Sequence, residues 1–457
     1  MFAAALLLLA APLSARAAEV TWDGMYRLRG EAFNNLSLSE VNPNAEGAQW
    51  SMDQRLRLQP NFLLSDRVSV HTQLDVLPFV RWGQAPSTRI DALTGESVPV
   101  EFADAVTPPL TADGAVTPAN IGVTRLWAEV ETPVGVVKFG RMPFEWGTGM
   151  VWNAGNRDID EFGDTTDRVT FTARAQQVFL MAGFENRSEG YVAQPDDFRS
   201  ALASVAWATE TAAVGGLVNY RWRRVQDEAT GDGRFNTVVA DLFGEAKLGH
   251  ADIKMEFAGF FGGGDTAAGA NDARLSQFGG NVQVGLAPDK LRAGLIAGFA
   301  TGDADLADNT TKTFTYDPDF NLSLLLFEEP LPTLAAAVPT TANDGRTLAA
   351  ARTGQALSNA IFLRPRVGYQ VHPTLALDLA WLGAQQAKQV PGSPTGRSYG
   401  SEFNLDATYA PFPHFSLRAT GALFLPGKHF TDFESDTLGG DFNRSTVAGR
   451  LLGTVTF

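Results

Sequence analysis

Arginines recur at two-residue steps along this chain, and the spacing has a clear chemical meaning. Two such residues lie on one face of an extended strand, roughly 7 Å apart. The guanidinium is planar, always charged and matched to carboxylate and phosphate groups. Rings of such side chains make anion-selective pores. The predicted pore-lining residues are Arg27, Arg29, Arg55, Arg57, Arg125, Arg221, Arg223, Arg364, Arg366, Arg418 and Arg450.

Carboxylates on the same strand faces allow a second interpretation of these arginines. They could pair with arginines on neighbouring strands and hold the strands rigidly together, and we expect this for roughly half of the arginines. Because the chain carries a net charge of -15, an inward set richer in arginine leaves the acidic excess to loops and turns. The predicted inward carboxylates are Glu31, Asp75, Glu129, Glu402 and Asp406.

An acidic segment rich in Gly and Trp, residues 143–167, follows a predicted strand end. We favour a solvated outer loop for it. The alternatives are an inward constriction and a Ca²⁺ site, although the carboxylate spacing does not match an EF-hand loop. As a constriction it would use Arg141, Trp146, Trp152, Asp158, Asp164, Asp167 and Arg168.

Catalytic residues are scarce. Of the five histidines only His71 falls within a predicted strand, where it is expected to form a satisfied pair with Asp75. A hydrolytic site would need Ser or Asp partners grouped with a His. Nucleotide fingerprints and metal-spaced His/Glu motifs are absent from the sequence. We therefore predict no enzymatic activity, no cofactor, no bound metal and no nucleic-acid partner.

The elements that position the arginines are β-strands with a period of two. Over 19–33, Trp22, Tyr26 and Leu28 share one face while Arg27 and Arg29 share the other. The segments 54–64, 67–76, 399–409 and 415–425 alternate similarly. With 19% charged residues and a mean hydropathy of -0.07, the chain is too polar for a helical membrane protein. It is typical of a barrel that turns one strand face to lipid.

Connections between the predicted strands alternate between short and long. Tight turns are predicted at 64–67, 131–135, 209–212, 248–252, 287–290, 371–374 and 410–414. Long connections fall near 34–49, 81–120, 143–167, 185–198, 226–233, 262–272, 302–354, 387–397 and 426–443. Short periplasmic turns and long extracellular loops characterise outer-membrane barrels. We therefore predict an all-β fold, a single antiparallel transmembrane β-barrel of about 18 strands, in the bacterial outer membrane.

Both chain ends fit this assignment. Residues 1–17 resemble a signal peptide, with an apolar run followed by Ala15-Arg16-Ala17, so the barrel is predicted over 18–457. The chain contains no Cys, which excludes disulfides. Phe457 ends the last predicted strand and resembles the terminal signal that the outer-membrane insertion machinery recognises. The predicted partners are this machinery and outer-membrane lipids.

Two stretches, Lys138 to Arg168 and Ser398 to Gly427, resemble the alginate-export type of outer-membrane barrel. In the first, Gly140-Arg141-Met142-Pro143-Phe144 leads into a loop that ends in Asp167-Arg168. The second resembles the family's closing hairpin, with Glu402 and Asp406 at matching places. The resemblance implies a single barrel with an Arg-lined lumen and, as in the named member, export of an anionic polysaccharide.

The predicted function is a channel for an anionic or polyhydroxylated solute, such as a small anion or a saccharide. Segments 143–167 and 302–354 would restrict its opening. The alternative is a plugged barrel that serves as a surface scaffold or binds ions or partners. The apolar stretch 317–332 is expected to cap the pore mouth or to lie against the outer leaflet, unless it packs within its own loop.

Overall fold

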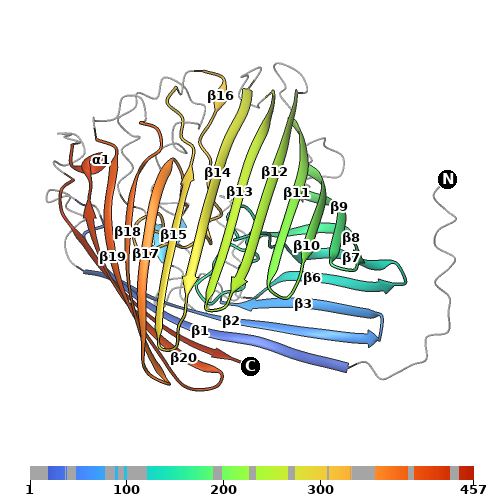
Figure 1. Ribbon diagram of the computed structural model, residues 1–457, viewed down its shortest axis with the longest axis horizontal. Coiled ribbons are helices and arrows are strands. Elements are labelled where there is room, and N and C mark those ends of the chain that lie inside the picture. Colours follow the sequence, from blue (N-terminus) through green and yellow to red (C-terminus); the bar gives the residue numbers. More distant parts are fainter. Residues whose placement is uncertain are drawn as a thin grey trace.

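The chain forms a closed barrel in the computed structural model (Figure 1). The structure describes residues 19–36, 38, 48–77, 88–90, 97–99, 121–188, 198–225, 233–265, 273–305, 308–329, 331, 356–389, 396–432 and 442–457. The predicted signal peptide, most of the predicted 81–120 loop and residues 332–354 lie outside these ranges.

Eighteen strands make the wall. They are β1 (Glu19–Asn34), β2 (Ala48–Ser65), β3 (Val68–Val76), β6 (Ile121–Thr132), β7 (Gly135–Pro143), β8 (Thr165–Ala175), β9 (Val178–Ser188), β10 (Phe198–Ala208), β11 (Ala212–Val225), β12 (Gly233–Leu248), β13 (Ala251–Gly264), β14 (Ala273–Leu286), β15 (Leu291–Ala300), β17 (Ala360–His372), β18 (Leu375–Gln386), β19 (Ser398–Phe412), β20 (Phe415–Pro426) and β21 (Thr446–Thr456). Each wall strand pairs antiparallel with its sequence neighbours in the wall. β1 pairs with both β2 and β21, which closes the barrel.

Four shorter elements are not part of this ring. β16 (Thr310–Thr311) pairs in parallel with β14, and β4 (Thr88–Ile90) with β5 (Ser97–Pro99) forms a separate hairpin. α1 (Lys428–Thr431) follows β20. No helix in the described ranges is long and apolar enough to span a membrane.

Alternation along each strand separates an apolar outside from a polar inside. On β1, Trp22 is 57% exposed, whereas Arg27 on the opposite face is 1% exposed. The same division runs round the ring, with Leu126, Val205 and Leu242 among the exposed outward residues. In Figure 1, β1 to β3 cross the direction of β11 to β14, as expected for inclined strands in opposite walls. The apolar outer face of the barrel is suited to contact with the hydrocarbon of a bilayer.

The predicted alternation of short and long connections is confirmed, with one addition. The seven predicted tight turns all join adjacent strands, and an eighth joins β8 to β9 at Gln176 and Gln177. Gln176 adopts a φ of 57°, a left-handed conformation without Gly, Asn or Pro to signal it. We call the end of the barrel with these turns the turn rim and the opposite end the loop rim.

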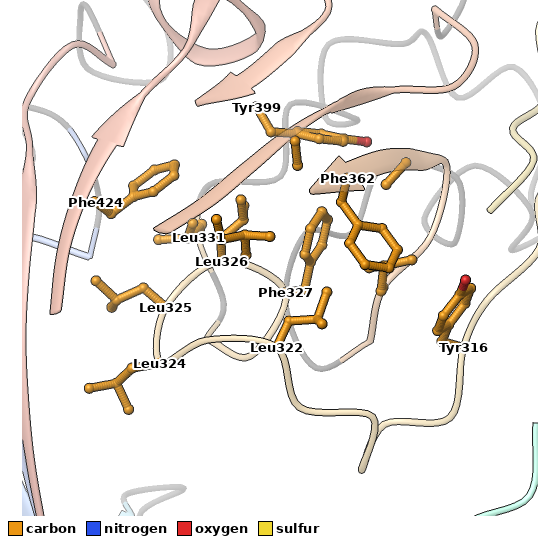
Figure 2. Close-up of a cluster of buried hydrophobic side chains, with 14 of the residues drawn as sticks. Tyr316, Leu322, Leu324, Leu325, Leu326, Phe327, Leu331, Phe362, Tyr399 and Phe424 are labelled. Atoms are coloured by element: carbon orange, nitrogen blue, oxygen red, sulfur yellow. The ribbon is translucent and has the colours of Figure 1, made fainter. Parts of the chain in front are cut away.

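The buried core lies inside the barrel. Figure 2 shows Leu324, Leu325, Leu326 and Phe327 packed near wall residues that include Phe424. All of these side chains are almost fully buried. The prediction that the apolar stretch 317–332 caps the mouth or lies on the outer leaflet is therefore wrong for its described part. Apolar side chains leave water more completely against the inner wall than at the barrel's rim.

Candidate functional site

Two segments fold into the barrel and occupy much of its lumen. The first lumenal segment, 144–164, connects β7 to β8; the second, 308–329, belongs to the connection between β15 and β17. In the first, Trp152 is 1% exposed and packs with Leu217 and Val239 of the wall. The preferred prediction of a solvated outer loop is thus wrong, because its Trp and Met side chains are buried against the wall.

A wall glutamate holds the first lumenal segment. Glu256 of β13 accepts hydrogen bonds from the backbone N–H and the hydroxyl of Thr148, and from the N–H of Met150 at 3.3 Å. Beside it, the indole N–H of Trp146 donates to Asp241 at 3.0 Å. The inward face of β12 and β13 therefore positions the base of this segment.

A second wall glutamate holds the second lumenal segment in the same way. Glu402 of β19 is fully buried and accepts the backbone N–H groups of Leu324, Leu325 and Leu326 at 2.7 to 3.1 Å. Together with the side-chain amide of Asn404, which donates at 2.7 Å, these N–H groups satisfy the charge of the buried carboxylate within a low-dielectric interior. Glu402 was predicted as an inward carboxylate, but its partners are backbone groups and Asn404, not arginines.

The two lumenal segments are also bound to each other. Asp319 accepts the N–H groups of Glu161, Phe162 and Gly163 at 2.7 to 3.0 Å. Asp317 and Asp164 share a side-chain hydrogen bond. Burial, together with Asp164, raises the pKa of Asp317 to about 8, and burial also raises the pKa of Asp164. A proton shared by two carboxyl groups thus links the segments.

A cavity of about 500 Å³ opens toward the loop rim. It is lined by Arg55, Arg57 and Arg125 of the wall, by Gly155 and Glu161 of the first lumenal segment, and by Arg187. Arg55 donates to the carbonyl of Asp160 at 2.8 Å, and Arg125 donates to Asn156 at 2.9 Å and to the carbonyl of Ala154. This outer cavity has a net positive lining, with five arginines against three carboxylates.

Two connected cavities lie on the other side of the first lumenal segment. One, of about 410 Å³, is lined by Arg364, Arg366, Asp406, Arg418 and Arg450 among others. The other, of about 250 Å³, shares Arg157, Ile296, Asn321 and Leu322 with it. Residues 153–163 therefore lie between the outer cavity and these two. The larger of the two, which we call the inner cavity, is basic, whereas the smaller is lined by three carboxylates and one arginine.

The predicted arginines divide into two groups. Arg27 and Arg29 hold Asp53 at 2.8 and 2.7 Å, Arg57 holds Asp75 at 2.8 Å, Arg450 holds Glu31 at 2.6 Å, and Arg418 lies 3.6 Å from Asp158. The other six have no described carboxylate within 4.0 Å, and these are Arg55, Arg125, Arg221, Arg223, Arg364 and Arg366.

Of the remaining predicted residues, Arg141 and Asp167 line the outer cavity and Asp406 lines the cavity of about 410 Å³. Arg141 and Asp167 form an exposed pair across β7 and β8 at 2.7 Å, and Arg168 pairs with Glu185 at 2.5 Å in a buried site. Glu129 accepts from Lys138 at 2.8 Å, and Asp406 accepts from Thr420 at 2.6 Å.

His71 does not pair with Asp75 as predicted. Its ring nitrogens contact Ser69 and Asn61, each at 2.8 Å, and the ring stacks on Trp127. A cross-strand neighbour is closer than a residue four positions away along an extended strand. In the described part of the chain, no group of three or more His, Cys, Asp or Glu side chains is placed to hold a metal ion.

Three carboxylates of this site were missed from the sequence. Asp53 follows the same inward alternation as Arg55, a signal that was present. Glu185 was placed at the start of a loop, although β9 continues to Ser188. Asp319 carries no such signal, because it belongs to neither a strand nor a known motif.

No protein-family model matches the sequence, and no curated protein matches it. Solved barrels are similar in structure. OccK9 (OpdG) of Pseudomonas aeruginosa is 14% identical with a TM-score of 0.54, covering 96% of this chain and 99% of that one. A BenF-like porin from Pseudomonas fluorescens Pf-5 is 12% identical with a TM-score of 0.53, covering 96% and 98%.

Pseudomonas aeruginosa OccK2 (OpdF), solved in complex with glucuronate, is 11% identical with a TM-score of 0.52 and covers 96% of each chain. At these identities the likeness establishes the fold. This chain is a closed, 18-stranded barrel of the outer-membrane porin type. Its apolar outside and its complete strand pairing place it in the bacterial outer membrane, with the turn rim toward the periplasm and the loop rim toward the outside.

Proposed function

We propose that this barrel is an outer-membrane channel for small anionic solutes, such as carboxylates or acidic sugars. The observation that supports it most is the presence of arginines without a described carboxylate partner on both sides of residues 153–163. Arg55 and Arg125 line the outer cavity, and Arg364 and Arg366 line the inner one. Fixed cationic charge in a narrow lumen lowers the electrostatic barrier to anions.

The paired arginines would serve a different purpose. Arg27, Arg29 and Arg57 form ion pairs with Asp53 and Asp75. Arg27 and Arg57 also hold the first lumenal segment by donating to the carbonyls of Asp158 and Gly155, and Arg29 holds it through the carboxylate of Glu161. Carboxylates among the cationic groups keep solute binding shallow enough for release. The glucuronate in the OccK2 complex belongs to the same chemical class as the solute proposed for this chain.

A polysaccharide, as implied by the resemblance to alginate export, is the larger candidate within this anionic class. Its passage requires both lumenal segments to move aside, since residues 153–163 divide the cavities.

The opposite alternative is a plugged barrel that acts as a surface scaffold. The buried core between the second lumenal segment and the wall favours that alternative.

The test is the reversal potential of the purified protein in planar bilayers under a salt gradient. We expect anion selectivity in the wild type. R364Q/R366Q should lower the anion-to-cation permeability ratio about fivefold, equivalent to about 1 kcal/mol of lost electrostatic stabilisation of the permeating anion. The matched control is R224Q/R234Q, which removes two positive charges from the outside of the barrel.

Three outcomes decide between the alternatives. Anion selectivity that falls only in R364Q/R366Q supports the proposal. A cation-selective or unselective wild type contradicts it. A silent wild type that conducts once D319A has removed the contact between the lumenal segments favours the plugged barrel.

A further inference from the structure

A group of arginines points outward from the barrel near the loop rim. Residues that lie opposite one another on neighbouring strands form rows across the outer face. One row on β10, β11 and β12 consists of Arg199, Trp222 and Asn236. In the next row toward the loop rim, Arg224 of β11 lies opposite Arg234 of β12. Continuing the first row through Gly263 of β13 leads to Arg274 of β14. We call Arg199, Arg224, Arg234 and Arg274 the outer basic patch.

The outer basic patch borders a hollow. A cavity of about 660 Å³ is lined by Arg199, Arg224, Arg234, Tyr220, Trp222 and Asn236, among others. Tyr220 and Trp222 stack, with their ring centroids 5.6 Å apart. Gly263 contributes no side chain, and the side chain of Arg274 lies beside it. Cationic groups therefore surround an aromatic floor with room for a ligand.

None of the described carboxylates forms an ion pair with Arg224, Arg234 or Arg274. Arg224 and Arg234 stand directly opposite each other, so their Cβ atoms are roughly 5 Å apart and their like charges repel. An anion between them would relieve this repulsion in a protein whose net charge is -15.

The position along the membrane normal identifies the class of ligand. The next outward row toward the turn rim is Ala201, Tyr220, Val238 and Phe261, which is apolar except for the tyrosine hydroxyl. Aromatic side chains sit at the boundary between hydrocarbon and headgroups. The outer basic patch is therefore at the level of the outer-leaflet headgroups, and that leaflet presents phosphorylated lipid.

We propose that the outer basic patch binds the phosphorylated headgroup of lipopolysaccharide. Arginine holds phosphate with short, paired, charge-assisted hydrogen bonds. The acyl chains of the lipid would continue down the apolar rows that begin at Tyr220 and Phe261. The inference depends on the outer-membrane location of the barrel and not on what passes through its lumen.

The test uses the folded full-length barrel in detergent and measures binding of bisphosphorylated lipid A. The same lipid without its phosphates is the comparison ligand. We expect the phosphorylated lipid to bind about tenfold more tightly or better. R224Q/R234Q should lose most of that preference, whereas R67Q/K290Q, with equal charge loss at exposed turns of the turn rim, should keep it.

Equal binding of the two lipids, or unchanged binding by R224Q/R234Q, would overturn the proposal. So would displacement of lipid A by inorganic phosphate alone, since that would indicate a site for free phosphate. Circular dichroism checks that each variant folds. Anion selectivity measured on the same variants separates this proposal from the channel proposal, because R224Q/R234Q should leave selectivity unchanged.

Discussion

Three carboxylates determine where the lumenal segments lie. Glu256 and Glu402 bind the segments to the wall, and Asp319 binds them to each other. Each accepts hydrogen bonds from two or three backbone N–H groups. A backbone that is neither helix nor sheet must find such acceptors when it is buried. These residues act on the channel through the segments they hold.

The anchor at Glu402 can be tested with a change of a single group. E402Q retains the shape but replaces one acceptor oxygen by an amide that cannot accept the N–H groups of 324–326. We expect hydrogen exchange of these amides to accelerate about tenfold or more, since hydrogen bonds to a buried carboxylate contribute about 1.5–3 kcal/mol each. D406N, four residues away on the same face of β19 and bonded to Thr420, is the control. If the amides of 324–326 exchange equally slowly in E402Q and D406N, Glu402 does not anchor the segment.

At the scale of elements, the wall was predictable and its contents were not. A period of two with short and long connections fixes strand faces and order, because neighbouring strands pair in sequence. The missed turn at Gln176 shows the limit, since a left-handed residue need not be Gly or Asn. Nothing in local periodicity distinguishes a long loop that enters the lumen from one that leaves it.

The contact between the lumenal segments should respond to pH. Burial, together with Asp164 and Asp319, raises the pKa of Asp317 from its usual value of 3.8 to about 8. Arg187 and Arg221 lie near Asp164 and oppose the increase in its pKa. Because the raised pKa favours the protonated, folded contact, the stabilisation is complete below about pH 4 and is lost as pH rises toward 8.

This dependence predicts more frequent opening in alkaline solution. Between pH 6 and pH 9 we expect single-channel conductance to become several-fold larger or more often fully open, as two carboxylates repel across the contact. D317N stays neutral and should remove the pH dependence. D303N is the control, because the hydrogen-bond partners of Asp303 among the described residues are the N–H groups of Asp305 and Lys312, within its own connection. A pH response that persists in D317N would assign it to other groups.

At the scale of the molecule, the barrel reverses the arrangement of a soluble protein, because its outer face is apolar and its inner face is polar. Its interior is also largely filled by the two lumenal segments. Exposed apolar residues face lipid, while the inside combines ion pairs with an apolar core that no strand pattern predicts. The inward arginines followed from alternation, but which of them are neutralised depends also on Asp53 and on Asp158 of the first lumenal segment. Asp158 and Arg418 lie far apart in the sequence, so only the closed barrel brings them together.

Closure of the barrel ends at Phe457, and the prediction that this residue serves insertion can be tested there. Its backbone exchanges two hydrogen bonds with Gly24 at 2.8 and 3.1 Å, and its side chain is 49% exposed. F457A keeps those backbone bonds, so the purified variant should refold in detergent like the wild type. Its yield in outer membranes should fall several-fold if the insertion machinery reads the exposed ring. F412A removes another exposed aromatic ring at the same rim, on a residue that is 61% exposed, and should insert normally. Equal membrane yields for F457A and the wild type would leave Phe457 with a purely structural contribution to closure.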